Sequence, residues 1–283
     1  MAHPIGLPTH LTELKRTLVM GVVNVTPDSF SDGGKFNSTK SAIEHGLQLA
    51  KDGADIVDVG GESTRPGAQR VTKEEELNRV IPVVRELVAN SVVVSVDTMR
   101  SEVALQAMNA GAQIVNDVSG GQADPEMFST IANSDIAYIM MHWRGHSADM
   151  ASQANYVDVV KNVQEELAAQ LAKATNAGIS ADRIVLDPGL GFAKTPEQNW
   201  PLLRHIAHFS SLGLPLLVGA SRKRFLGELL GSPDQPRDVE QREAATTAVT
   251  TLLAEQRVWA VRVHDVTAAR DAIAVVEKLR EQL

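Results

Sequence analysis

The 283-residue sequence contains no cysteine, which excludes disulfide bonds and catalysis by a thiolate. No apolar segment approaches the roughly 18 residues that a membrane-spanning helix needs, so we expect no membrane partner. Lysine and arginine form no runs and the formal net charge is -8, so we expect no nucleic-acid partner. Residues 1–10 lack the basic and apolar regions of a signal peptide, and we therefore expect a soluble, cytoplasmic protein.

What the sequence does contain is a regular alternation of short β-branched runs with longer amphipathic stretches. Strands that alternate with helices predict a parallel α/β sheet, and buried parallel strands are apolar along their length. The predicted strands are Thr17–Val23, Ile56–Val59, Val92–Val96, Ile114–Val115, Ile136–Met141, Ile184–Leu186, Leu214–Val218 and Val258–Val263. The predicted helices include Thr39–Asp52, Lys73–Ala89, Ser101–Asn109, Val157–Ala177 and Asp238–Glu255.

The closure of the sheet is indicated by the residues after the first predicted strand. An open, doubly wound sheet would carry a glycine-rich phosphate-binding turn there, whereas this chain has Asn24–Phe30, with the sequence NVTPDSF. Eight strand–helix repeats fit a closed (β/α)8 TIM barrel better, since such a barrel typically needs about 250 residues. No linker rich in proline, glycine or serine divides the chain, so we predict one TIM-barrel domain over residues 1–283.

Polar residues follow the predicted strands, which is where a TIM barrel carries its active site. Any one of them could instead cap the next helix, and for a single residue capping is the commoner role. Capping does not, however, call for the cations that end the seventh and eighth strands. The polar residues are Asn24, Asp58, Asp97, Asn116, His142, Asp187, Ser221, Arg222, Lys223, Arg262 and His264.

The cations at strands seven and eight suggest an anion site. Arg262 and His264 are two residues apart on one strand, so their side chains should point the same way, into the barrel mouth. A guanidinium group suits phosphate oxygens, and phosphate sites in these barrels often lie near the last two strands. Arg222 and Lys223 add charge nearby in a chain that is acidic overall. The alternative is that Arg262 pairs with a carboxylate and His264 caps a helix.

Asp97, Asn116 and Asp187 end three different strands and could face one ligand. A buried carboxylate needs a partner, and a flat ligand with adjacent N–H groups would satisfy Asp187, with Asn116 at its ring edge. Lys223 could bind a ring carbonyl or pair with one of the acids. Paired acids are also typical of a metal site or of general acid–base catalysis, and the residues alone leave these alternatives open.

Two segments rich in glycine, proline and small polar residues, 26–34 and 60–67, follow the first two strands. This composition predicts exposed, mobile loops, which could be ordinary turns. Phe30 places a large apolar side chain in the first loop, and Arg65 places a cation in the second. A lid that closes over the barrel mouth and excludes water would account for both residues.

At these positions the chain resembles the dihydropteroate synthase family, and the matching motifs run in the family's order from the first strand to the eighth. The two loop motifs and the SRK and RVHD strand endings are specific, whereas SVDT or NDVSG alone would be weak. The motifs are NVTPDSFSDGG within Met20–Gly34, DVGGESTRPG at Asp58–Gly67, SVDT at Ser95–Thr98, NDVSG at Asn116–Gly120, Met141–His142, LDPGLGFAK at Leu186–Lys194, GASRK at Gly219–Lys223 and RVHDV at Arg262–Val266.

The resemblance implies a transferase of folate biosynthesis and a target of sulfonamides. In the implied reaction, 6-hydroxymethyl-7,8-dihydropterin diphosphate condenses with p-aminobenzoate to give 7,8-dihydropteroate and diphosphate. The implied cofactor is Mg²⁺, and the implied assembly is a cytoplasmic homodimer. A pterin-binding methyltransferase barrel would lack the diphosphate clamp and both loop motifs, and a non-catalytic pterin-binding homologue would be expected to have degraded loops.

The same resemblance assigns roles to the residues. Asn24 would bind Mg²⁺, and Arg262 and His264 would clamp the diphosphate with help from Thr64. The catalytic residues would be Arg262, His264, Lys223 and Asp97. The pterin pocket would consist of Asp97, Asn116, Met141, Asp187, Phe192 and Lys223. The p-aminobenzoate end would consist of Phe30, Arg65, Pro66, Ser221 and Arg222. Trp143 departs from the family pattern, in which many members have methionine after the histidine.

Overall fold

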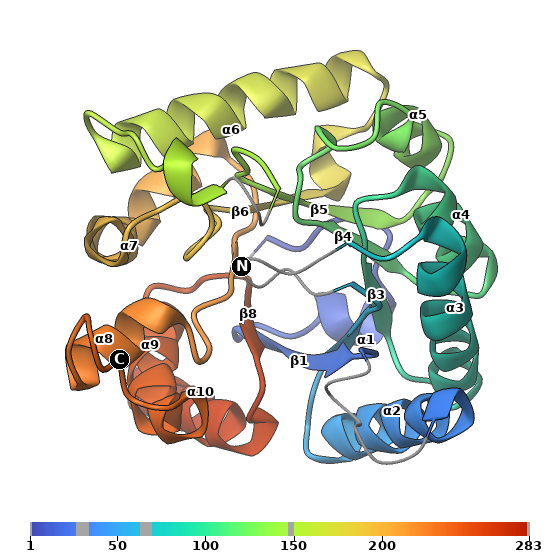
Figure 1. The fold of residues 1–283 in the computed structure, drawn as a ribbon, viewed down its shortest axis with the longest axis horizontal. Coiled ribbons are helices and arrows are strands. Elements are labelled where there is room, and N and C mark those ends of the chain that lie inside the picture. Colours follow the sequence, from blue (N-terminus) through green and yellow to red (C-terminus); the bar gives the residue numbers. More distant parts are fainter. Residues whose placement is uncertain (1, 27–33, 63–69, 147–149, 282–283) are drawn as a thin grey trace.

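The computed structural model describes residues 2–26, 34–62, 70–146 and 150–281. Its centre is one eight-stranded parallel sheet in the order β6-β5-β4-β3-β2-β1-β8-β7 (Figure 1). A bridge from Leu186 in β6 to Leu216, just before β7, closes this sheet into a barrel and confirms the predicted TIM-barrel fold. The strands are β1 (Leu18–Asn24), β2 (Ile56–Gly60), β3 (Val94–Asp97), β4 (Ile114–Asp117), β5 (Ala137–Met141), β6 (Ile184–Asp187), β7 (Leu217–Val218) and β8 (Ala260–Val263).

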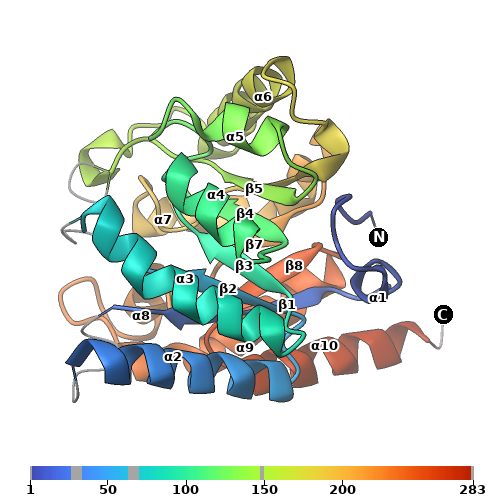
Figure 2. The ribbon, with the colours of Figure 1, turned by 90° about the vertical axis from the view of Figure 1, so that its right-hand side faces the viewer.

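Helices cover the outside of the barrel, while the short α1 (Thr9–Thr12) lies at one of its ends (Figures 1 and 2). In the described part of the chain, no helix has both the length and the apolar character needed to span a membrane. The outer helices are α2 (Gly34–Lys51), α3 (Lys73–Ala89), α4 (Ser101–Asn109), α5 (Met127–Ala132), α6 (Val159–Asn176), α7 (Pro196–Arg204), α8 (Arg224–Leu230), α9 (Glu243–Glu255) and α10 (Val266–Arg280).

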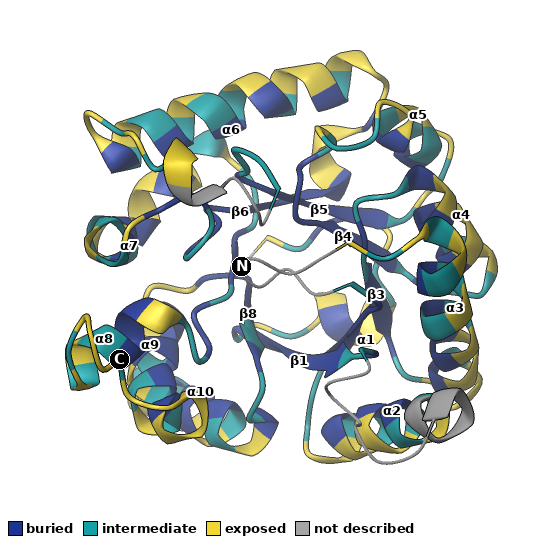
Figure 3. Cartoon of the chain, viewed as in Figure 1, coloured by how far each residue is buried: buried dark blue, intermediate teal, exposed yellow. Residues whose placement is uncertain are grey.

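The core has two layers because successive strand residues point to opposite faces of the sheet. In β2, Val57 and Val59 belong to the cluster that also includes residues of the helices, whereas Ile56 belongs to a second cluster. This second cluster includes Leu11 of α1 and Trp259, which precedes β8. Figure 3 shows that the strands are buried along most of their length. The sequence of each strand therefore fixes which residues fill the barrel and which support the helices.

Strand register brings the polar residues together at one edge of the barrel. Gly60 pairs with Asn24 of β1 on one side and with Asp97 of β3 on the other. Asp97 pairs in turn with Asn116 of β4. These residues stand at the carboxyl ends of parallel strands, which is the end where TIM barrels carry their active sites.

Helix capping does not account for this ring of polar residues, because several helices have caps of their own. The side chain of Thr72 accepts a hydrogen bond at the start of α3, and Asp158 does the same for α6. Thr195 forms a capping box at α7, and Asp265, not His264, caps α10. The alternative in which His264 caps the last helix is therefore wrong.

Candidate active site

Arg262 lies at the centre of the polar ring and binds two carboxylates from neighbouring strands. Its Nε donates to Oδ2 of Asp58 at 2.7 Å, and its Nη2 donates to Oδ2 of Asp97 at 2.9 Å. The side chain of Arg262 remains 23% exposed, so part of the guanidinium group is accessible from outside the ring. The carboxylate pairing that the sequence left open for Arg262 is thus present, and it orients the cation at the barrel mouth.

Asp58 is the residue that connects three strands at this point. Besides Arg262, its Oδ2 accepts a hydrogen bond of 3.0 Å from Nδ2 of Asn116. The side chain is fully buried, and its Oδ1 has no hydrogen-bond partner among the described residues. Sequence reasoning noted Asp58 as a polar strand end but gave it no role in the site. Its place in the DVGGESTRPG motif was the available signal.

Burial makes the charge on Asp97 costly. It raises the pKa of Asp97 to about 7, although Arg262 opposes the rise and the neighbouring Asp58 adds to it. Two carboxylates that share one guanidinium group cannot both be fully compensated by it. A ligand that offers N–H groups to Asp97 would therefore stabilise its ionised form.

Asp187, Lys223 and Phe192 form a second group across the barrel mouth. Oδ1 of Asp187 accepts a hydrogen bond of 2.7 Å from the backbone N–H of Gly189. Burial raises the pKa of Asp187 to about 6 and lowers the pKa of Lys223 to about 8. Nζ of Lys223 lies 4.3 Å from the centroid of the Phe192 ring, which is a cation–π distance. Met141, at the end of β5, is buried and pairs in register with Asp187.

Together the two groups suit a flat, polar, ring-shaped ligand. They offer carboxylate acceptors, an amide that can both donate and accept, and an ammonium donor, beside an aromatic ring and a methionine. Each buried charge would gain a partner when such a ligand binds. A pterin, the ligand that the resemblance implies for these residues, is of this kind.

At the end of β7, Ser221 contacts His264 from β8. Oγ of Ser221 lies 2.9 Å from Nδ1 of His264 and accepts a hydrogen bond of 3.2 Å from its backbone N–H. Arg222 turns away to α9, where its Nε donates to Oε2 of Glu243 at 2.7 Å. His264 and Arg262, which were expected to act together, thus bind different neighbours.

Asn24 ends β1 at the barrel mouth. Its side chain is half-buried and has no hydrogen-bond partner among the described residues, so its amide oxygen is available to a ligand. Within the same described ranges, no group of three or more histidine or acidic side chains could hold a metal ion. A cation at Asn24 would therefore need most of its ligands from the substrate and from water.

Four of the predicted site residues lie outside the described residues: Phe30, Thr64, Arg65 and Pro66. Their predicted places in the two loops stay predictions. The residues on either side of 63–69 are linked, since Glu62 accepts hydrogen bonds from Arg70 at 2.9 Å and from Arg100 at 2.8 Å. Arg100 also pairs with the buried Glu76 of α3.

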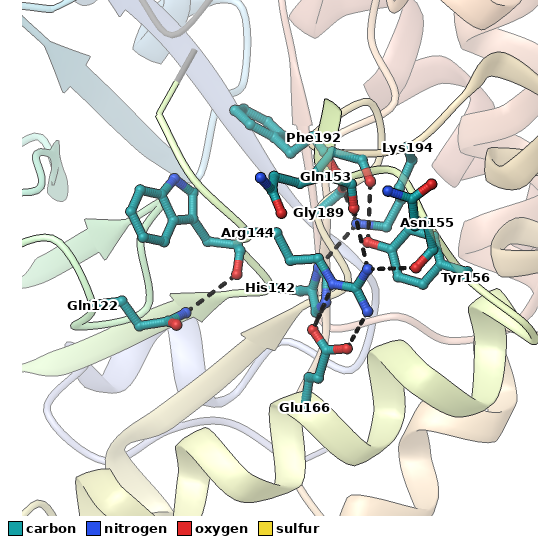
Figure 4. A network of polar contacts seen from close by, with 12 residues as sticks. Gln122, His142, Arg144, Gln153, Asn155, Tyr156, Glu166, Gly189, Phe192 and Lys194 are labelled. Atoms are coloured by element: carbon teal, nitrogen blue, oxygen red, sulfur yellow. Dashed lines mark hydrogen bonds and ion pairs between the residues drawn. The ribbon is translucent and has the colours of Figure 1, made fainter. Parts of the chain in front are cut away.

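His142, at the end of β5, belongs to a network that sequence reasoning missed (Figure 4). Its Nδ1 lies 3.0 Å from Nζ of the buried Lys194, and its Nε2 lies 3.0 Å from Oε2 of Glu166 in α6. Lys194 was visible only as the last residue of LDPGLGFAK, and Glu166 as one of several acids in a predicted helix. The ring of Trp143 packs edge-on against His146, with 5.0 Å between centroids.

Comparison with known proteins gives consistent matches. The chain matches the family described as pterin binding enzyme over residues 20–264. It is 50% identical to the dihydropteroate synthase of Mycobacterium leprae over 260 residues, which cover 91% of this chain and 92% of that protein. The corresponding enzyme of Bacillus subtilis is 42% identical over 260 residues, covering 92% and 87%.

Solved structures of dihydropteroate synthases are also similar to this chain. The Xanthomonas albilineans dihydropteroate synthase with 4-aminobenzoic acid superposes with a TM-score of 0.87 and 44% identity, covering 94% of each chain. The Yersinia pestis dihydropteroate synthase in a sulfonamide complex gives a TM-score of 0.88 and 37% identity, covering 99% of this chain and 98% of the other.

Proposed function

The chain belongs to the dihydropteroate synthase family of pterin-binding enzymes, and from that premise we propose which of its residues perform each part of the reaction. It is a transferase that condenses 6-hydroxymethyl-7,8-dihydropterin diphosphate with p-aminobenzoate, giving 7,8-dihydropteroate and diphosphate. The observation that supports the assignment is the set of buried carboxylates around Arg262 and Lys223 at the barrel mouth.

The pterin ring is held, in this proposal, by Asp187, Asn116, Asp97 and Lys223. The two carboxylates accept hydrogen bonds from ring N–H and amino groups, and Lys223 donates to the ring carbonyl. Support comes from the raised pKa values of both acids, because a carboxylate that is costly in the free protein gains most from new donors. Met141 and Phe192 form the apolar walls.

The diphosphate is bound by Arg262 and His264, with Thr64 as a third contact. Arg262 uses Nε and Nη2 for Asp58 and Asp97, which leaves Nη1 without a hydrogen-bond partner among the described residues. Nη1 can therefore donate to a phosphate oxygen while Asp58 keeps the guanidinium group in place. This orientation by Asp58 is the part of the proposal that the sequence did not suggest.

The chemical step exchanges one bond at the exocyclic CH₂ of the pterin. The bond from this carbon to the diphosphate oxygen breaks, a bond to the arylamine nitrogen forms, and that nitrogen then loses a proton. Arg262 and His264 stabilise the charge that develops on the leaving group. Asp97 and Lys223 act on the ring, where the ionised Asp97 stabilises positive charge that spreads from the CH₂.

Mg²⁺ is proposed as the cofactor, with Asn24 as its protein ligand. The residues fit the ion, since Asn24 presents an oxygen donor that is not engaged with another described residue. Mg²⁺ is commonly held by few protein groups together with substrate phosphates and water. When bound, the ion would neutralise charge on the departing diphosphate.

p-Aminobenzoate is proposed to bind beside Ser221 and Arg222, with Phe30, Arg65 and Pro66 closing over it. The ion pair from Arg222 to Glu243 leaves the arginine side chain 29% exposed, so it can also meet a carboxylate. The family resemblance further suggests a cytoplasmic homodimer. Exposed Leu252, Val275 and Leu279 on α9 and α10 offer apolar surface for a second copy.

The test of the assignment is diphosphate release, followed in real time with both substrates, with each substrate omitted in turn, and with Asp97→Asn and Arg262→Gln variants. We expect release to require both substrates and to fall by roughly 100-fold or more in the variants. Full activity in folded variants would remove these residues from the catalytic site. Release without p-aminobenzoate would indicate hydrolysis rather than transfer.

A further inference from the structure

Lys194 is a buried cation that the proposed chemistry does not use. It follows the turn 188–193 after β6, and Figure 4 shows its side chain pointing back into that turn. Its Nζ donates to the backbone carbonyls of Gly189 and Phe192, each at 3.0 Å, and lies 3.0 Å from Nδ1 of His142. An ammonium group has three N–H bonds, and all three have partners here.

The contact between Lys194 and His142 fixes the tautomer of the histidine. An ammonium group can only donate, so Nδ1 of His142 accepts and its Nε2 carries the hydrogen, which it donates to Glu166 at 3.0 Å. Burial and Lys194 lower the pKa of His142 to about 4, in agreement with a neutral ring. Arg144 completes the network, since its hydrogen bonds to Glu166 lower the pKa of that acid to about 2.

The turn that Lys194 binds has a conformation that few side chains favour. Gly189, Gly191 and Ala193 have φ values of 67°, 76° and 46°. The turn is tied at other points, because the N–H of Gly191 donates to Asn199 at 2.7 Å and the hydroxyl of Tyr156 donates to the carbonyl of Ala193 at 3.0 Å. The carbonyls of Gly189 and Phe192, however, converge on Lys194.

Both ends of the turn belong to the pterin site. Gly189 donates its backbone N–H to the Asp187 carboxylate, and the Phe192 ring lies under Lys223. His142 also donates its backbone N–H to the carbonyl of Asp187 at 2.8 Å. Removal of the Lys194 amine would therefore take a donor from both carbonyls, and of the two only the Gly189 carbonyl keeps another among the described residues, the backbone N–H of Phe192 at 3.1 Å.

We propose that Lys194 is a positioning residue of the pterin site, whose ammonium group, oriented by His142 and Glu166, holds the turn 188–193 so that Asp187 and Phe192 face the ring. This inference rests on the proposed roles of Asp187 and Phe192. It assigns Lys194 to pterin affinity and not to the p-aminobenzoate end.

The charge on Lys194 should make pterin affinity depend on pH. Asp187 and Glu166 favour the charged form of Lys194, Arg144 and Lys223 disfavour it, and burial outweighs them all, lowering its pKa to about 7. Loss of this proton leaves two N–H bonds for three partners, so one contact is lost and the Lys194 contribution to pterin affinity should fall as the pH rises through about 7. Ionisation of Asp97 raises affinity over the same range, so the Lys194 contribution is read from the difference between variants. Loss of the proton from Lys223 gives a second fall at about 8.

Lys194→Met tests the role directly, with Lys161→Met as the control, because Lys161 lies on α6 with a 68% exposed side chain. We expect Lys194→Met to raise KM for the pterin substrate about 10-fold or more, the effect of one charge-assisted contact, and to leave KM for p-aminobenzoate within about two-fold. Equal changes in both KM values, or a loss of kcat alone that tracks the folded fraction, would overturn the proposal.

Glu166→Gln keeps the proposal testable if Lys194→Met fails to fold. Removing this carboxylate should lower the pKa of Lys194 further, so the first alkaline fall in pterin affinity should move to lower pH. The pH at which pterin affinity falls should be unchanged in Lys161→Met. If this pH is also unchanged in Glu166→Gln, the proposal is overturned. Asp187→Asn distinguishes a failure of the pterin-site assignment from a failure of the role proposed for Lys194. If Asp187→Asn leaves pterin affinity unchanged, the pterin site itself is wrongly assigned, whatever the Lys194 variants show.

Discussion

Replacing Asp187 with asparagine should make the free protein more stable and the pterin complex weaker. The folded-state pKa of Asp187 is about 6, against an ordinary value of 3.8. At about 1.4 kcal/mol per pH unit, the buried charge destabilises the folded chain by about 3 kcal/mol once both states are ionised. Asparagine removes the charge and keeps the oxygen that accepts from Gly189. A gain of about 3 kcal/mol corresponds to a rise in Tm of roughly 5 °C or more.

The sign of the pH dependence follows from the raised pKa. Below pH 3.8 the carboxyl group is neutral in both states and contributes nothing. Between pH 3.8 and about 6 the unfolded wild type releases this proton while the folded protein keeps it, so the wild type loses about 3 kcal/mol over that range, whereas Asp187→Asn does not. The stability difference between the two proteins should therefore be near zero at about pH 4 and near 3 kcal/mol at pH 7.5. Asp97 titrates in both proteins, so its contribution largely cancels in the difference.

Urea unfolding at both pH values, followed by tryptophan fluorescence, measures this difference. Asp182→Asn is the matched control, because Asp182 is exposed and should change stability little at either pH. Calorimetric titration with a pterin should show Kd for Asp187→Asn raised by about 10- to 100-fold. A variant that is less stable at pH 7.5, or equally stabilised at both pH values, would show that Asp187 does not carry a desolvated charge.

Three further outcomes are expected. Asp58→Asn should lower the pKa of Asp97, since Asp58 helps to raise it, and the acid limb of kcat/KM should move to lower pH from about 7; an unmoved limb would contradict the coupling. Chelation of Mg²⁺ should abolish diphosphate release and added Mg²⁺ should restore it, while Asn24→Ala should need more Mg²⁺ for half-maximal rate. Pro66→Ser or Phe30→Leu should weaken a sulfonamide more than p-aminobenzoate, by about 1–3 kcal/mol; equal rises in the inhibition constant and KM would place both residues away from the drug.

The barrel could be predicted from the sequence because each buried strand is encoded locally, as a short β-branched run. The predicted strand Leu214–Val218 shows where local patterns stop, since only Leu217–Val218 is strand. Pro215 has no N–H to donate to a ladder, so this segment pairs with β6 through its carbonyl and through a single bridge at Leu216. The closure of the barrel thus depends on a segment too irregular to be assigned from its composition.

The site could be predicted as a set of strand-end residues but not as a set of contacts. Because side chains two residues apart on a strand point the same way, the sequence predicts that Arg262 faces the barrel mouth. Its partners Asp58 and Asp97, however, are 204 and 165 residues away in the sequence. Only the register of β8, β1, β2 and β3 brings these groups together. Lys194 could not be assigned at all, because its function depends on two backbone carbonyls and on a histidine 52 residues away.

The distribution of charge along the barrel explains how the chain tolerates so costly a site. Inside the barrel, the amino-terminal ends of the strands contribute apolar side chains such as Leu18, Ile56 and Ile114, all fully buried. The charged groups of the site lie at and after the carboxyl ends of the strands, where burial disfavours the ionised forms of Asp97, Asp187, Lys194 and Lys223. In the proposed site, the free energy that the folded chain loses at Asp97, Asp187 and Lys223 would be recovered when the pterin supplies their partners. Substitutions that neutralise one of these charged residues should therefore raise the stability of the free protein and lower its activity. Substitutions in the apolar interior should lower both stability and activity.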